Sequence, residues 1–189
     1  MISTHDNNLI NHYLLATPNI QDPLFASSVV YLCEHNEEGS MGMVINHPSD
    51  KTLSSILTQL DIPCDIPEIN DIPIYIGGPV RLEQGFVLHT SSEHWDHSIL
   101  IGDGIYLTSS RDLLEAIAAA NGPDQFMVLL GLSGWSAGQL EQELRENAWL
   151  TSSSSRQITF NEDIDQKWQM AFDTLGFSLD KLSPTTGHA

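Results

Sequence analysis

IPIYIGGPVRLEQGFVLHTSSEHWDHSILIGDGIYLTSS, residues 72–110, contains four short apolar segments separated by glycine, proline and polar residues. The segments IPIYIGGPV, GFVLHT, SILIG and GIYLTSS are rich in β-branched and aromatic residues, which is typical of strands. Turn-forming residues interrupt the run, so each strand is expected to be short. The middle of the chain is therefore predicted to be a β-sheet, and the helices must come from the segments on either side.

On the N-terminal side, two further strands are predicted to form a hairpin. SSVVYLCEH (27–35) has strand composition, NEEGS is a turn, and MGMVINH (41–47) resumes as a strand that Pro48 stops. The next segment, TLSSILTQL (52–60), places four apolar residues at helical spacing and ends before a proline. A helix is predicted there.

On the C-terminal side, helices and strands alternate. We predict helices over 111–120, 138–149 and 161–176, strands over 125–133 and 156–160, and a loop over Ser152–Ser155. The last helix has an apolar stripe that is expected to pack on the sheet, formed by Ile164, Trp168, Phe172 and Leu175. Most of the predicted strands precede most of the predicted helices in the sequence. This order favours an α+β fold over a regularly alternating parallel sheet.

Length and charge restrict the classes of partner. With 189 residues we expect one domain over 1–189, with residues 1–12 as a flexible N-terminal tail. There are 25 acidic and 7 basic residues, giving a formal net charge of -18. This charge repels nucleic acid and anionic membranes, and the few cations form no run. We therefore expect no direct binding to nucleic acid or membrane.

Cysteine usage and the N-terminal sequence indicate a compartment. Cys33 and Cys64 lie far apart without a C-x-x-C motif, which favours a reducing environment over a disulfide framework or a zinc knuckle. The N-terminus has no cationic segment followed by a long apolar one, and no apolar run reaches membrane-spanning length. A cytoplasmic protein is expected.

Residues Gly134 to Gly138 read GWSAG, a match to the G-x-S-x-G nucleophile elbow of serine hydrolases. Ser136 would need a histidine base, and the only histidine after it is His188, one residue from the end of the chain. Chain ends are usually mobile, whereas a base must stay within hydrogen-bond reach of its nucleophile. We therefore favour a structural strand-to-helix turn and keep Ser136 as an alternative nucleophile.

Several blocks in a fixed order carry a family resemblance. LLATPNIQDPLFASSVVYLCEHNEEGSMGMVIN, IYIGGPV, GFVLHT, LLGLSGWSAGQLEQEL, NAWL and the terminal GHA together resemble the AlgH/YqgE family of bacterial proteins, from about Tyr13 to Ala189. The resemblance implies an α+β fold with a mixed, bifurcated sheet curled into a partial barrel. Members are largely uncharacterised biochemically and are often labelled transcriptional regulators. The resemblance also implies that the position of Ser136 is not restricted to serine, and no catalytic residue carries over.

Two glycine-containing segments are candidate binding sites. Gly77 and Gly78, followed by Pro79, permit close approach either to a neighbouring strand or to a ligand in a small cleft. Gly134 and Gly138 flank Trp135, which is either a core anchor or a partner-facing aromatic residue. Two polar residues are further candidates. Asn46 is expected to fix a turn through its amide. Gln139 lies at the N-terminus of a predicted helix, whose free backbone N–H groups either bind an anion or bond to side chains of the protein itself.

No cofactor or metal is expected. Neither a dinucleotide-binding fingerprint nor a phosphate loop is present. His94 and His97, with His89 nearby, could be imagined as metal ligands, but they fall in a polar connection that is expected to be solvated. His35 and His47 flank the hairpin, where bonds to the local backbone are expected.

Three function classes remain. We favour a noncatalytic regulatory or binding module that acts through a protein or small-molecule partner, because no cofactor loop or complete nucleophile–base pair is evident. The alternatives are a serine hydrolase that uses Ser136 and a transcriptional regulator that binds DNA directly. The charge of -18 opposes direct DNA binding. The identity of the partner and the oligomeric state have no signature in the sequence.

Overall fold

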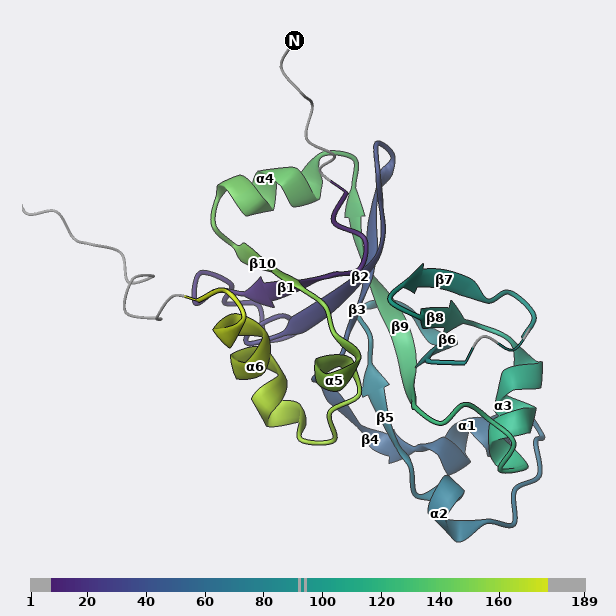
Figure 1. Cartoon of the computed structure of the whole chain (residues 1–189). Helices are drawn as coiled ribbons and strands as arrows, with labels where there is room; N and C mark the ends of the chain where they lie inside the picture. The colour runs from purple at the N-terminus through teal and green to yellow at the C-terminus, as the bar shows by residue number, and fades with distance from the viewer. Residues whose placement is uncertain (1–7, 92, 94, 177–189) are drawn as a thin grey trace, which may run out of the picture.

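The computed structural model describes residues 8–91, 93 and 95–176 and confirms an α+β fold (Figure 1). Within those residues, ten strands form one sheet, eight of them in the order β10-β1-β2-β3-β9-β6-β8-β7, with β4 and β5 branching from it. The strands are β1 His12–Ala16, β2 Val29–Asn36, β3 Gly39–Val44, β4 Pro48–Thr52, β5 Pro73–Ile76, β6 Val80–His89, β7 Ile99–Gly102, β8 Ile105–Thr108, β9 Phe126–Ser136 and β10 Trp149–Ser153.

Strand β9 is the point at which the sheet divides. Its first half, over Val128–Leu130, pairs in parallel with β5 on one side and antiparallel with β6 on the other. Its last residues, Ser133–Ser136, pair antiparallel with β3. Between the two halves, Gly131 has a positive φ of 71°, which favours glycine. The mixed, bifurcated, curled sheet is therefore as the resemblance implied.

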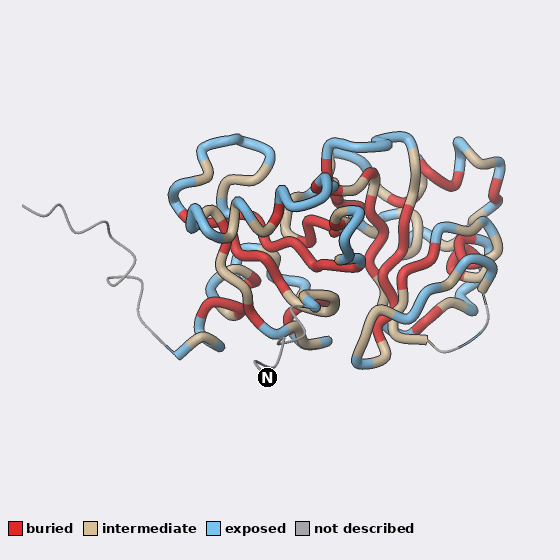
Figure 2. The backbone as a smooth tube through the Cα atoms, turned by 90° about the horizontal axis from the view of Figure 1, so that it is seen from above, coloured by how far each residue is buried: buried red, intermediate tan, exposed pale blue. Residues whose placement is uncertain are grey.

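Side-chain alternation along the strands produces an inner core with outer clusters on both branches. Tyr13, Leu15 and Tyr31 face the inner core together with Tyr75 and Leu129 from the other branch. The intervening residues of β1 and β2 face outward and pack with α4 and its neighbours, whereas those of β5, β6 and β9 pack against α1 and α3. Because both faces of these strands are covered, the buried residues follow the strands through the molecule (Figure 2).

The helices cover the two branches and the open side of the curl. They are α1 Leu53–Gln59, α2 Pro67–Asn70, α3 Arg111–Ala118, α4 Gln139–Arg145, α5 Arg156–Thr159 and α6 Lys167–Asp173, with a 3-10 turn, η1, at Ile164–Gln166. In Figure 1, α1, α2 and α3 lie together at one end, while α5 and α6 lie beside β1 and β10. The predicted stripe of the last helix is confirmed, because Phe172 is in the inner core and the other three residues pack against it.

Four local predictions are wrong. The helix predicted over 138–149 ends at Arg145, and Trp149 begins β10. Residues 156–159 form helix α5, because the Ser155 side chain accepts a hydrogen bond from the Ile158 backbone N–H and caps the turn. Ser152 and Ser153 belong to β10, not to a loop. The helix predicted over 161–176 begins only at Lys167, after η1.

Residues 8–12 fall within the predicted N-terminal tail, and the structure gives them specific contacts. His12 begins β1, and the Asn11 side chain donates a hydrogen bond to Asp103 over 2.7 Å. The same side chain accepts hydrogen bonds from the hydroxyls of Tyr31 and Ser154. These bonds join the start of the chain to three separate segments.

Candidate functional site

The sequence-predicted site residues lie at two places along β9. Gly77, Gly78 and Pro79 lie beside its middle, and Gly134 to Gln139 form its end and the start of α4. The Ser133 hydroxyl donates a hydrogen bond to the Gly77 carbonyl over 3.1 Å and thereby links the two places. Trp135 nevertheless packs on the outer face of the β1–β3 branch, away from the cleft beside Gly78.

The two glycines of IYIGGPV allow β5 to lie directly against β9. A Cβ atom on Gly77 would lie 2.5 Å from the Gly131 carbonyl oxygen, and one on Gly78 would lie 2.2 Å from the Leu132 carbonyl carbon. Gly78 also has a φ of +155°. The close approach is therefore made to the neighbouring strand, and these glycines bring the following residue, Pro79, to the surface.

Asn46 fixes the base of the first hairpin. Its side-chain oxygen accepts a hydrogen bond from the Val29 backbone N–H over 2.8 Å, and its amide nitrogen donates to the Ser27 carbonyl over 2.9 Å. Ser27 has a positive φ of 58°. The Asn46 amide therefore satisfies the backbone at an irregular turn and positions the residue after it, His47.

A shallow apolar cleft of about 300 Å³ lies beside Asn46 and the two glycines. We call it the Pro79 cleft. Val44 and Ile76 form part of its lining, together with Pro23, Leu24, His47, Pro48, Gly78 and Pro79. Leu24 is 49% exposed and Val80, next to Pro79, is 43% exposed. Apolar side chains are therefore gathered around a cavity and not scattered over the surface.

Burial of the His47 ring keeps the Pro79 cleft uncharged. Desolvation lowers the pKa of His47 below its ordinary value of 6.5, and a backbone hydrogen bond with Ala26 offsets only part of this effect. The imidazole is therefore predominantly neutral at pH 7. An uncharged imidazole among prolines and aliphatic residues suits an apolar occupant.

The GWSAG segment does not form a strained nucleophile elbow. Ser136 is the last residue of β9, pairs in register with Gly39, and is not among the described residues with a positive φ. Its hydroxyl donates to the Gln139 side-chain oxygen over 3.2 Å, and its backbone N–H donates to the same oxygen. The Gln139 amide thus satisfies the turn, and His188 lies outside the described residues.

Glu143 holds the aromatic cluster behind this turn. One of its carboxylate oxygens accepts hydrogen bonds from the indole nitrogens of Trp135 and Trp149, over 2.9 and 2.7 Å. The two indoles meet edge to face, with centroids 5.9 Å apart. Trp135 is only 6% exposed. It is a core anchor, and Glu143, which the sequence analysis did not single out, fixes its orientation.

His35 bonds a side chain, contrary to the expected backbone bond. Its Nδ1 lies 2.9 Å from the Ser40 hydroxyl, and its Nε2 lies 3.7 Å from a Glu141 carboxylate oxygen. These contacts join the tip of the hairpin to α4. Of the other histidine candidates, His89 is fully buried beside Thr108, and His94 lies outside the described residues.

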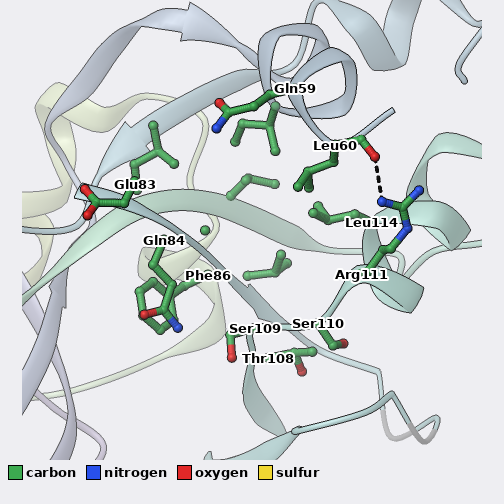
Figure 3. Close-up of a pocket in the computed structure, with 15 residues that line it drawn as sticks. Gln59, Leu60, Glu83, Gln84, Phe86, Thr108, Ser109, Ser110, Arg111 and Leu114 are labelled. Atoms are coloured by element: carbon green, nitrogen blue, oxygen red, sulfur yellow. Dashed lines mark hydrogen bonds between the residues drawn. The ribbon is translucent and has the colours of Figure 1, made fainter. Parts of the chain in front are cut away.

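A second cavity, of about 270 Å³, lies between α1, α3 and β6 (Figure 3). Its apolar lining includes Val87 and Leu114, and Gln59 and Glu83 also line it. Arg111 also lines it, but its guanidinium donates to the Leu60 carbonyl and to Glu115. The Arg111 guanidinium therefore joins α3 to the end of α1, and it is not free to bind a molecule in this cavity.

Two further observations concern metals and membranes. Among the described residues, no group of three or more histidine, cysteine, aspartate or glutamate side chains is arranged to hold a metal ion. No helix within the same residues combines the length and apolar character needed to cross a bilayer.

Comparison with known proteins places the chain in a family. The AlgH-like family model matches residues 13–180. The chain belongs to the AlgH-like family. A UPF0301 protein from Thioalkalivibrio sulfidiphilus is 46% identical over 186 residues, covering 98% of this chain and all of the relative. A UPF0301 protein from Xanthomonas campestris is 44% identical over 181 residues, covering 96% of each chain.

Solved structures agree with this assignment. The solution structure of the AlgH protein from Pseudomonas aeruginosa matches with a TM-score of 0.81 and 41% identity, covering 100% of both chains. A crystal structure of a protein from Corynebacterium diphtheriae matches with a TM-score of 0.67 and 20% identity, covering 86% of this chain and 85% of that one. The second match shows the fold alone. The fold and resemblance predicted from the sequence are both confirmed.

Proposed function

We propose that this AlgH-like protein is a noncatalytic binding module whose Pro79 cleft takes an apolar group of a protein or small-molecule partner. The observation that carries this proposal is the exposure of Leu24 at a cavity that three prolines also line. A contiguous apolar surface with a depression is typical of an interaction site, whereas single exposed apolar residues are ordinary. The neutral His47 ring is consistent with an occupant that carries no charge.

The serine hydrolase alternative has less support from the geometry. The Ser136 hydroxyl is hydrogen-bonded to an amide oxygen, which cannot act as its base. Its backbone lies in a regular ladder with Gly39 and not in a strained turn. The bonds made by Gln139 provide a structural reason for the polar residues at this turn.

The test places a photoreactive residue in the cleft. p-Benzoylphenylalanine at position 24 is compared with the same residue at position 100, because Leu100 is also exposed but lies on β7, away from the cleft. After irradiation in cells, position 24 is expected to give discrete adducts that position 100 does not give. The adducts are identified by mass spectrometry.

Two matched substitutions then distinguish specific binding at the cleft from nonspecific hydrophobic association. Leu24→Ser is expected to reduce recovery of the cross-linked partner with tagged protein, while Leu100→Ser leaves it unchanged. Both side chains are already half exposed, so neither substitution should disturb the fold. Equal recovery with both variants, or identical adducts from both positions, would count against the cleft as the binding site.

A further inference from the structure

The largest of the three cavities described here lies at the other end of β5, away from the Pro79 cleft. Its volume is about 480 Å³, and it opens between the start of β9, strand β5 and the connection from α5 to η1. We call it the Tyr75 cavity. Three aromatic side chains line it, from Tyr75, Phe126 and Phe160. The α5–α6 connection can be followed beside β5 in Figure 1.

The polar residues of the lining are Tyr75, Asp124, Gln125, Asn161 and Glu162, of which only the two carboxylates carry charge. Asp124 and Glu162 are exposed residues of its lining. Tyr75 is only 9% exposed, yet its hydroxyl has no hydrogen-bond partner among the described residues and is not enclosed by protein atoms. This hydroxyl is therefore available to a molecule in the cavity.

The negative charge of Glu162 affects the pKa of the Tyr75 hydroxyl. Burial raises the pKa of Tyr75 above its ordinary value of 10, and the charge of Glu162 raises it further. The phenol therefore stays protonated at neutral pH. It can accept a hydrogen bond with its oxygen lone pairs while the carboxylates attract a cation.

A basic side chain, Lys167, lies close to the Tyr75 ring and is fully buried. Its ammonium nitrogen donates to the Ile45 and Thr159 carbonyls, over 2.9 and 2.8 Å, and lies 5.7 Å from the centroid of the Tyr75 ring. Lys167 does not line the cavity and forms no ion pair with its carboxylates among the described residues. Within residues 8–91, 93 and 95–176, Asp124 and Glu162 therefore have no cationic partner.

We propose that the Tyr75 cavity binds an alkyl ammonium group, with its carbon chain against the aromatic rings and its charged end between Asp124, Glu162 and the Tyr75 hydroxyl. The aromatic rings offer apolar contact to the carbon chain, and an ammonium offers three donors to the acceptors present. The overall charge of -18 favours the approach of a cation. The same chemistry is offered by a free primary amine and by a lysine side chain of another protein.

The test compares a charged and a neutral ligand of the same shape. Amide spectra of the 15N-labelled protein are recorded during titration with 1-pentylamine and with 1-pentanol, at constant pH and at an ionic strength of about 0.15 M to screen nonspecific attraction. The amine is expected to bind about tenfold more tightly than the alcohol. The perturbed amides should centre on Tyr75, Phe126 and Phe160.

Three variants probe the polar groups, and a fourth is a control. Asp124→Asn and Glu162→Gln are each expected to weaken amine binding about two- to fivefold, because both carboxylates are partly solvated. Tyr75→Phe keeps the ring and is expected to weaken it about threefold by removing the hydroxyl. Glu83→Gln removes the same charge from the lining of the other cavity and should leave binding unchanged.

Three results would overturn the proposal: equal binding of 1-pentanol, perturbed amides away from the Tyr75 cavity, or an equal loss with Glu83→Gln and Glu162→Gln. A further titration distinguishes the two sources of the ammonium group. Tighter binding of Nα-acetyl-lysine N-methylamide than of 1-pentylamine indicates a lysine side chain of a partner. The reverse order indicates a free amine.

Discussion

His89 should make the folded protein sensitive to mild acid. Its ring is fully buried, lies against Tyr106 with centroids 5.7 Å apart, and has Nε2 2.8 Å from the Thr108 hydroxyl. Burial lowers the pKa of His89 from 6.5 to about 4. In the unfolded chain the ring takes up a proton near pH 6.5, so protonation favours unfolding. The stability contributed by the neutral ring is present above pH 6.5 and is lost as the pH falls toward 4.

The magnitude follows from the two pKa values. A gap of about 2.5 pH units corresponds to about 3 kcal/mol below pH 4, at roughly 1.4 kcal/mol per unit. Between pH 7 and pH 5 the same linkage gives a loss of about 2 kcal/mol. The second range is the better one experimentally, because it stays above the isoelectric point of about 4.4, where solubility is lowest.

The assay is urea unfolding of the wild type and of His89→Gln at pH 7, 6 and 5. The substitution has its own cost, which is the same at each pH, and the carboxylates titrate alike in both proteins. The free energy of unfolding should therefore fall by about 2 kcal/mol more in the wild type than in the variant between pH 7 and pH 5. A difference between the two proteins that stays constant within about 0.5 kcal/mol would refute the reasoning.

The remaining predictions concern backbone, charge and reactivity. Gly78→Ala should lower the free energy of unfolding in urea by at least about 2 kcal/mol, because the new Cβ atom would meet the Leu132 backbone. The control Gly85→Ala, whose Cβ atom would have nothing within 4 Å, should change it by less than about 0.5 kcal/mol. Equal effects of the two substitutions would contradict this prediction. Burial lowers the pKa of Lys167 to about 7, so wild-type stability should rise between pH 7 and pH 10 relative to Lys167→Met, and parallel stability curves would contradict it. A fluorophosphonate probe should not label Ser136; labelling that Ser136→Ala abolishes would restore the hydrolase reading.

Local sequence signals predicted those elements whose determinants are local. The hairpin over residues 27–47 was predicted correctly because strand composition and a turn lie side by side in the sequence. The strands of residues 72–110 were found for the same reason. The helix at Leu53 was predicted from its spacing of apolar residues, which the structure buries against β5 and β6.

The missed elements depend on distant partners. Ser152 has no strand propensity of its own, but it pairs with β1, and its hydroxyl donates a hydrogen bond to the Ala171 carbonyl. Residues 156–160 were predicted as a strand because Ile158 and Phe160 alternate with polar residues, whereas residues 156–159 form α5. A serine cap and contacts with the inner core decide the outcome there.

The candidate sites were predicted only in part. Gly78 and Pro79 of the Pro79 cleft were found because glycine and proline punctuate the sequence, but Leu24 lies in a loop without a motif. Tyr75 and Glu162 are 87 positions apart, counted as 162 − 75, and meet only in the folded chain. No periodicity in the sequence could have brought them together.

Strand β9 belongs to both branches of the sheet, and this limits where new chain ends can be introduced by circular permutation. A circular permutant with new ends beside Asn121 would leave β9 whole, so both branches could assemble on it. New ends at Gly131 would divide it between the part that pairs with β5 and β6 and the part that pairs with β3. The two parts of β9 would then lie at opposite ends of the permuted chain, and they would have to meet again before both branches could pair with one strand.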